Sequence, residues 1–127
     1  MQPSIFTKII NGELPCHKIY EDERTIAFLD INPVQPGMTL VVPKVQVDHL
    51  EDLEDEDFAA VMHATKLLML HIRDELQVER VCVVVEGFDV PHAHVRLVPC
   101  NTPEDLHATP YEADQDELTD MAERLTY

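Results

Sequence analysis

The chain has 127 residues, 45% of them hydrophobic, and is long enough to fold as one domain, residues 1–127, around a single core. Its 25 acidic and 9 basic residues give a formal net charge of −16, which argues against polymeric DNA or RNA and against anionic membrane surfaces as partners. The sequence has no apolar run of the roughly 18 residues that a membrane span requires, no signal-peptide pattern at its start and no C-x-x-C motif, so we expect a cytoplasmic protein without disulfide bonds.

The N-terminal third predicts a short helix followed by three strands. Ser4 is a candidate N-cap for a helix in "SIFTKIINGELP", and Asn11-Gly12 ends that helix. The short β-rich runs "HKIYED" and "TIAFLDI" predict a hairpin, and "MTLVVP" predicts an apolar strand that ends at Pro43.

The segment from Asp55 to Leu76 predicts the one long helix. The acidic residues at its start suit the positive end of the helix macrodipole. His63 and His71 fall outside the apolar stripe, so we expect both on the solvated surface. The stripe itself, at three- and four-residue steps, consists of Phe58, Val61, Met62, Leu68, Met69, Ile72 and Leu76.

The remaining segments predict two more strands and a final helix. "RVCVVVEG" predicts a buried strand, and "PHAHVRLVP" predicts the next one, antiparallel to it because only a short loop joins them. After a loop with two prolines, "ADQDELTDMAERL" predicts a short amphipathic helix. The whole pattern predicts an α+β fold: about five strands in an antiparallel sheet, one long helix on a face, and short terminal helices.

The last predicted strand carries an unusual alternation of residues. His92, His94 and Arg96 share one face of the strand, while the residues between them face the core. One interpretation is an ordinary solvated face. A second is a metal site, although Arg96 repels a cation and no cysteine pair completes the ligand set. A third is phosphate chemistry, in which a neutral imidazole attacks phosphorus and the arginine binds the phosphate oxygens.

The stretch "HAHVRLVP" resembles the signature of the histidine triad (HIT) family: His, apolar, His, apolar, His and two apolar residues, often followed by proline. "SIFTKIINGELP", "IYEDERTIAFLDINP" and "QPGMTLVVPK" are similar, in order and spacing, to the family's opening segments. The resemblance covers residues 4–99, leaves a loop and helix in residues 100–127, and favours phosphate chemistry. It implies a HIT-like α+β fold and a homodimer whose two sheets join.

The resemblance also implies a role for each site residue. His94 matches the nucleophile that forms a nucleotidyl-histidine intermediate, and His92 matches the histidine that orients it. Asp30 matches the acid that accepts the ribose hydroxyls, so His94 and Asp30 should face one cleft. The apolar pocket around the base is matched by Ile5, Phe6, Ile9, Phe28, Leu29 and Ile31.

The chain departs from the family's pattern at several polar positions. Arg96 replaces the third histidine, where we expect it to stabilise phosphate charge, and Met38 replaces another active-site histidine. Ser4, Thr7 and Gln46 stand where zinc-binding bacterial members carry Cys, Cys and His. We therefore expect no structural zinc and no required cofactor.

Two functions are compatible with the resemblance and these departures. The favoured one is a nucleotidyl hydrolase or transferase that acts through His94 on purine nucleotide conjugates, either phosphoramidates or dinucleotide polyphosphates. The alternative is a nucleotide-binding or sensor module with little or no turnover, because Arg96 and Met38 replace two active-site imidazoles. In both cases the expected small-molecule partner is a purine nucleotide.

Overall fold

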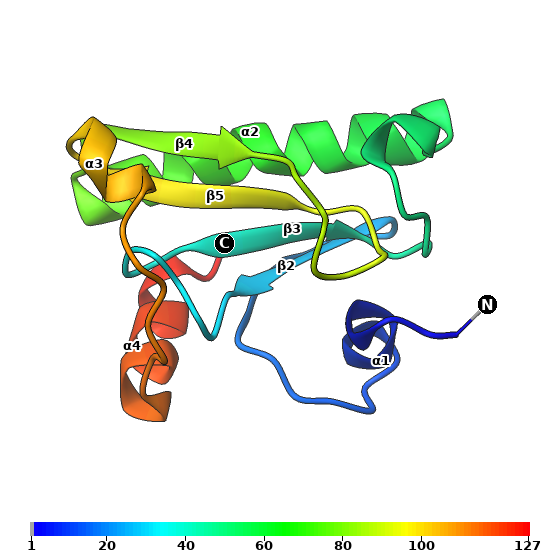
Figure 1. The fold of residues 1–127 in the computed structure, drawn as a ribbon, viewed down its shortest axis with the longest axis horizontal. Coiled ribbons are helices and arrows are strands. Elements are labelled where there is room, and N and C mark those ends of the chain that lie inside the picture. The colour runs from blue at the N-terminus through cyan, green and yellow to red at the C-terminus, as the bar shows by residue number, and fades with distance from the viewer. Residues whose placement is uncertain (1) are drawn as a thin grey trace.

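Five antiparallel strands form one sheet in the order β1-β2-β3-β5-β4, with helices on both sides of it (Figure 1). The computed structural model describes residues 2–127. The elements are β1 (Lys18–Glu21), β2 (Thr25–Leu29), β3 (Thr39–Pro43), β4 (Arg80–Val84), β5 (Val95–Cys100), α1 (Ile5–Ile10), α2 (Asp55–Leu76), α3 (Pro103–Leu106), α4 (Gln115–Leu125) and a 3-10 turn, η1 (Leu50–Asp52). This architecture confirms the predicted α+β fold. Within residues 2–127, no helix is both long enough and apolar enough to cross a membrane.

Helix α2 has the predicted bounds and packs against one face of the sheet, where Figure 1 shows it running along β4 and β5. Phe58 and Met62 were predicted to lie on its apolar stripe, but they are 40% and 38% exposed. That prediction is wrong because the line of contact runs through Ala64 and Thr65, further round the helix. The buried positions, three and four residues apart, are Val61, Ala64, Thr65, Leu68 and Ile72.

His71 is half-buried, which contradicts the prediction that it lies on the solvated surface. Its Nε2 donates to the carbonyl oxygen of Leu125 at 3.1 Å, and its ring packs edge-on against Tyr127. The prediction failed because the C-terminal end of the chain returns to α2, a contact that no local pattern reveals. His63 is exposed, as predicted.

The opposite face of the sheet positions α1. Ser4 caps this helix by accepting the N–H of Thr7 at 3.0 Å, as predicted. One side chain of α1, Phe6, packs into an apolar cluster on strands β2 and β3 that contains Ile26, Phe28, Leu40 and Val42. The helix is only six residues long, so this packing rather than intrinsic propensity holds it in place.

The last two strands differ from the predictions in two ways. β4 is the edge of the sheet, and only Val81 among its five residues is buried, so it is not the buried strand that its apolar run predicted. An apolar run alone cannot distinguish a central strand from an edge strand. β5 begins at Val95, so His92 and His94 precede the strand instead of lying within it.

Candidate active site

The two histidines lie at the end of the loop that joins β4 to β5, and both of their rings contact Phe6 of α1. Figure 1 shows this loop beside α1. β5 pairs with β3 only from Val95 onward, so the ladder does not hold this segment. The backbone N–H of Ala93 instead donates to the carbonyl of Val47 at 2.7 Å. The N–H of His92 donates to the carbonyl of Val90 at 2.8 Å, so this segment is held by two backbone hydrogen bonds together with the side-chain contacts of His92 and His94.

The His92 ring is completely buried and bonded at both nitrogens. Nε2 lies 2.8 Å from the carbonyl oxygen of Pro43, and because a carbonyl only accepts, Nε2 carries the proton. In the neutral ring Nδ1 then accepts a hydrogen bond from the hydroxyl of Ser4 at 2.7 Å. Burial lowers the pKa of His92 below its usual value, so the ring is held in the neutral form.

The His94 ring is 7% exposed and packs edge-on against Phe6, with 5.0 Å between the ring centres. Its Nδ1–H donates to the carbonyl oxygen of His92 at 2.8 Å. In the neutral ring, Nε2 therefore carries the free lone pair. The burial of both histidines contradicts the interpretation of this stretch as a solvated strand face.

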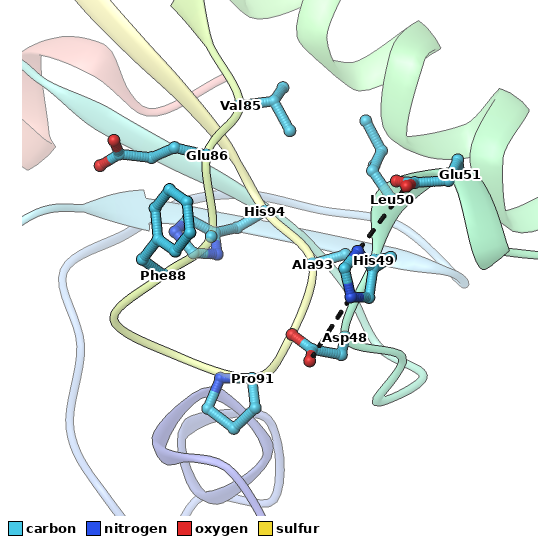
Figure 2. Close-up of a pocket in the computed structure, with 11 residues that line it drawn as sticks. Asp48, His49, Leu50, Glu51, Val85, Glu86, Phe88, Pro91, Ala93 and His94 are labelled. Carbon is cyan, nitrogen blue, oxygen red and sulfur yellow. Dashed lines mark ion pairs between the residues drawn. The ribbon is translucent and has the colours of Figure 1, made fainter.

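His94 lines a hollow of about 280 Å³ whose lining is acidic (Figure 2). Three acidic residues, Asp48, Glu51 and Glu86, are among those that line it, and Figure 2 shows the Glu86 carboxylate directed away from the side of Asp48 and Glu51. The His49 ring lies between Asp48 and Glu51: its Nε2 is 3.9 Å from Oδ2 of Asp48, and its Nδ1 is 3.6 Å from Oε2 of Glu51. Such a lining disfavours a further anionic group and favours a neutral or cationic one.

Arg96 is next to this hollow but does not line it. Its Nη1 forms an ion pair with Oε1 of Glu86 at 3.2 Å, so a carboxylate of the lining balances its charge. The Nε of Arg96 is buried and has no hydrogen-bond partner within residues 2–127. The guanidinium is therefore only partly satisfied, and its other N–H groups remain to bind a further acceptor.

A second hollow of about 280 Å³ holds Asp30. One carboxylate oxygen of Asp30 accepts the N–H of Asn32 at 2.8 Å, which leaves the other oxygen for a ligand. Among the predicted pocket residues, Ile5 and Ile31 are more than half exposed, whereas the Leu29 side chain belongs to the core under α2. All six predicted pocket residues line the hollow, together with four that no sequence pattern marked: Leu14, Pro15, Cys16 and Leu40.

The two hollows share no lining residue, so the expectation that His94 and Asp30 face one cleft is not met. Phe6 connects them, because it lines the hollow of Asp30 while its ring contacts His94. The same ring packs on Phe28 with 5.6 Å between centres. Both sites therefore adjoin the Phe6 ring, an arrangement that the sequence alone could not show.

The side chains around His92 do not suit a zinc ion. Ser4, Thr7 and Gln46 offer two hydroxyl groups and an amide, which are poorer zinc ligands than thiolates and imidazoles. Their oxygens already take part in hydrogen bonds of 2.7 and 3.0 Å. Residues 2–127 contain no group of three or more His, Cys, Asp or Glu side chains that could hold a metal ion.

Met38 is buried and contributes no polar group to the His94 hollow. It packs with Val98 and Cys100, and its sulfur accepts the N–H of Val34 at 3.4 Å. Its side chain therefore serves the packing of the sheet rather than the site.

Comparisons with known proteins agree on one family. Residues 11–102 match the family model described as the HIT domain. An uncharacterised HIT-like protein of Methanocaldococcus jannaschii is 37% identical over 100 residues, which cover 75% of this chain and 77% of that protein. The adenosine 5'-monophosphoramidase hnt1 of Schizosaccharomyces pombe is 33% identical over 97 residues, which cover 75% of this chain and 72% of that protein. The crystal structure of a HIT-like protein from Bartonella henselae superposes with a TM-score of 0.89 at 29% identity, covering 97% of this chain and 93% of that one.

Proposed function

The chain belongs to the HIT family, and we propose that it is a nucleotidyl hydrolase or transferase that acts on a purine nucleotide conjugate through His94. The observation that carries this proposal is the 2.8 Å hydrogen bond from His94 Nδ1 to the His92 carbonyl, which leaves Nε2 as a nucleophile. The similarity to a relative named as an adenosine 5'-monophosphoramidase supports the assignment to nucleotide chemistry.

In the proposed reaction, the lone pair of His94 Nε2 attacks the α-phosphorus of the nucleotide. The bond from phosphorus to the leaving group breaks, and the leaving group takes the electron pair and a proton from solvent. A water oxygen, or an acceptor in a transferase reaction, then attacks the phosphorus, the P–Nε2 bond breaks, and the proton of the water passes to solvent. With water the product is the nucleoside monophosphate, and with an acceptor, which likewise gives up a proton, it is the nucleotidylated acceptor; in both cases His94 is regenerated, and no metal or cofactor enters the balance.

The proposed binding mode places the base and ribose in the hollow of Asp30. The free oxygen of Asp30 accepts a ribose hydroxyl, and the exposed side chains of Ile5 and Ile31 contact the base. The phosphate extends along the Phe6 ring to His94, where Arg96 donates to a phosphate oxygen.

The acidic hollow beside His94 favours an amine over a polyphosphate as the leaving group. A leaving group that departs into this hollow enters a lining that includes three acidic residues, Asp48, Glu51 and Glu86. Each close pair of like charges costs about 1 kcal/mol at 4 Å when water screens it. Of the two substrate types that the sequence left open, we therefore favour nucleoside phosphoramidates over dinucleotide polyphosphates.

The ion pair of Arg96 and Glu86 also supports a second candidate function. With its guanidinium balanced by a carboxylate, and with Met38 in place of an imidazole, the chain could bind a nucleotide without turning it over. In that function the site is a nucleotide sensor, and Arg96 provides no catalysis.

Hydrolysis assays with adenosine 5'-phosphoramidate and with a diadenosine polyphosphate distinguish these functions. The enzyme assignment expects turnover of the phosphoramidate, a loss of about 10³-fold or more in His94→Ala, and no loss in His63→Ala, which removes an exposed histidine of α2. In Glu86→Gln, the ratio of kcat/KM for the phosphoramidate to kcat/KM for the diadenosine polyphosphate should fall by roughly fivefold to tenfold. Nucleotide binding without turnover of either compound by the wild type would instead support the sensor.

We also propose that two copies pair through β4 to form a homodimer. β4 is an edge strand with unpaired backbone groups, and the side chain of Val83 on it is 42% exposed. An edge strand can pair antiparallel with its own copy across a two-fold axis, which makes a second copy the simplest occupant. Sedimentation of Val83→Lys should show a monomer, whereas Val45→Lys, at an equally exposed valine outside the edge, should sediment like the wild type. A dimer that survives Val83→Lys would contradict this pairing.

The three cysteines favour a reducing compartment such as the cytoplasm. Cys16, Cys82 and Cys100 are all free thiols. Cys82 and Cys100 pack together on the neighbouring strands β4 and β5, and burial raises the pKa of Cys100 to about 12. In keeping with the charge of the chain, the proposed partners are a purine nucleotide and a second copy, not polymeric nucleic acid or a membrane.

A further inference from the structure

We propose that Ser4, Thr7 and Gln46 act together as positioning residues for the nucleophile. They form a hydrogen-bonded cluster that keeps the His92 ring in one tautomer and one place, and residue 92 in turn orients the His94 ring. This inference rests on the proposed function, because it concerns how the nucleophile assigned there is held.

The outer part of the cluster fixes the direction of every hydrogen bond. The Oε1 of Gln46 accepts the backbone N–H of Ser4 at 2.7 Å and the hydroxyl of Thr7 at 2.7 Å, while its Nε2 donates to the carbonyl of Gln2 at 2.8 Å. The single hydroxyl proton of Thr7 is therefore used, and its oxygen can only accept further bonds.

The Ser4 hydroxyl then has one proton and two possible acceptors. His92 Nδ1 lies 2.7 Å away and the Thr7 oxygen lies 3.3 Å away, so the bond to His92 is the better one. If His92 were protonated at Nδ1, Nδ1–H would donate to the Ser4 oxygen. The Ser4 hydroxyl could then donate only to the Thr7 oxygen, over the longer distance of 3.3 Å. The cluster therefore favours the neutral ring. Burial, the largest effect, lowers the pKa of His92; the hydrogen bond to the Pro43 carbonyl raises it and the nearby His94 lowers it, so the pKa is lowered on balance.

The tautomer of His92 matters because residue 92 supports the nucleophile directly. The His92 ring is anchored at both ends, to Ser4 through Nδ1 and to the Pro43 carbonyl through Nε2. Its own carbonyl accepts Nδ1–H of His94 at 2.8 Å in a segment that no strand ladder holds. Losing the Ser4 bond frees one end of this anchor, so His94 loses its orientation as well.

Three substitutions at position 4 separate this role from the capping of α1. Ser4→Thr keeps both the N-cap and the donated proton, and Ser4→Ala loses both. Ser4→Asp keeps a good N-cap, but its carboxylate can only accept, so His92 must place a proton on Nδ1. Asp114→Ala, which removes the N-cap of α4 far along the chain, controls for the loss of a helix cap elsewhere.

The readouts are the ring-nitrogen NMR shifts of His92 and His94 across pH, and the single-turnover rate with adenosine 5'-phosphoramidate. In Ser4→Asp we expect doubly protonated His92 at pH values where the wild-type ring is neutral. We also expect a rate lower by about 10- to 100-fold and an acid limb of the pH–rate profile moved to higher pH. Ser4→Thr and Asp114→Ala should match the wild type in both readouts.

A folded Ser4→Asp variant with wild-type shifts for His92 would overturn the inference, whatever its rate. A changed His92 with an unchanged rate would also overturn it, because the cluster would then not act on the nucleophile. If the wild type hydrolyses nothing, the proposed function fails. The shifts of His94 in Ser4→Asp still decide whether the cluster positions its ring.

Discussion

Replacing Phe6 by alanine tests whether one ring supports both the fold around α1 and the His94 imidazole. The side chain is 6% exposed and its ring contacts those of Phe28, His92 and His94 at centre distances of 5.6, 5.7 and 5.0 Å. Truncation of a buried phenylalanine costs about 3–5 kcal/mol, from lost burial plus the cavity that remains. A domain of this size is stable by about 5–15 kcal/mol, so Phe6→Ala should lose a large share of that free energy.

The measurement is urea unfolding followed by far-ultraviolet circular dichroism, since the chain has no tryptophan to report by fluorescence. All variants are compared at one protein concentration, because dimer formation would make the midpoint depend on it. Phe88→Ala is the matched control. This phenylalanine is 92% exposed, and its loss should change stability by no more than about 0.5 kcal/mol. Equal effects of the two substitutions, or a loss below about 1 kcal/mol in Phe6→Ala, would refute the packing described for Phe6.

Three further predictions concern pH and backbone conformation. Burial lowers the pKa of His92 below 6.5 in the folded protein, so the unfolded chain binds more protons at this residue. The stability that the neutral ring contributes is therefore complete above about pH 6.5. It is lost as the pH falls from there through the pKa of the folded protein. Urea midpoints between about pH 8 and pH 5 should therefore fall less in His92→Asn than in the wild type. Gly37→Ala should destabilise by about 1–3 kcal/mol in the same assay, since φ is +87° and an added Cβ would lie 2.7 Å from Cδ1 of Leu76; an unchanged midpoint would contradict this geometry. Burial and a hydrogen bond to Asp22 raise the pKa of Tyr20 to about 12. In an ultraviolet titration of the tyrosines, Tyr20→Phe should therefore remove a component that ionises at high pH. Loss of a component that ionises at lower pH would show that the phenol is not held in this way.

The elements of this fold were predictable where the pattern is local. The bounds of α2 follow from apolar residues at three- and four-residue steps, and the β1–β2 hairpin follows from two β-rich runs around a polar turn. The exposure of β4 was not predictable, because its valines fit a buried strand as well as an edge strand. The half-burial of His71 depends on the return of the C-terminus to α2, which is a tertiary contact.

The sequence singled out His92, His94 and Arg96 as candidates, but it did not reveal how these residues are arranged. The alternation drew attention to His92 and His94, yet both are buried, lie before β5 and are held by side-chain hydrogen bonds rather than by strand pairing. Arg96, near the start of β5, forms an ion pair with Glu86, just after β4. From the sequence we expected Arg96 to bind phosphate, because a partner just beyond the neighbouring strand could not be foreseen. The cluster of Ser4 and its neighbours went unnoticed as a functional unit because its members are 42 and 88 positions from their partners.

The most direct test of the central claim is to trap the intermediate on the protein. A labelled adenosine 5'-phosphoramidate is mixed with the protein, the reaction is stopped with denaturant during turnover, and the modified peptide is located by mass spectrometry. The proposed mechanism predicts one nucleotidyl group per chain on His94, labile in acid and stable in base, absent from His94→Ala and present in His63→Ala. Steady turnover without any adduct, or an adduct on another residue, would contradict it.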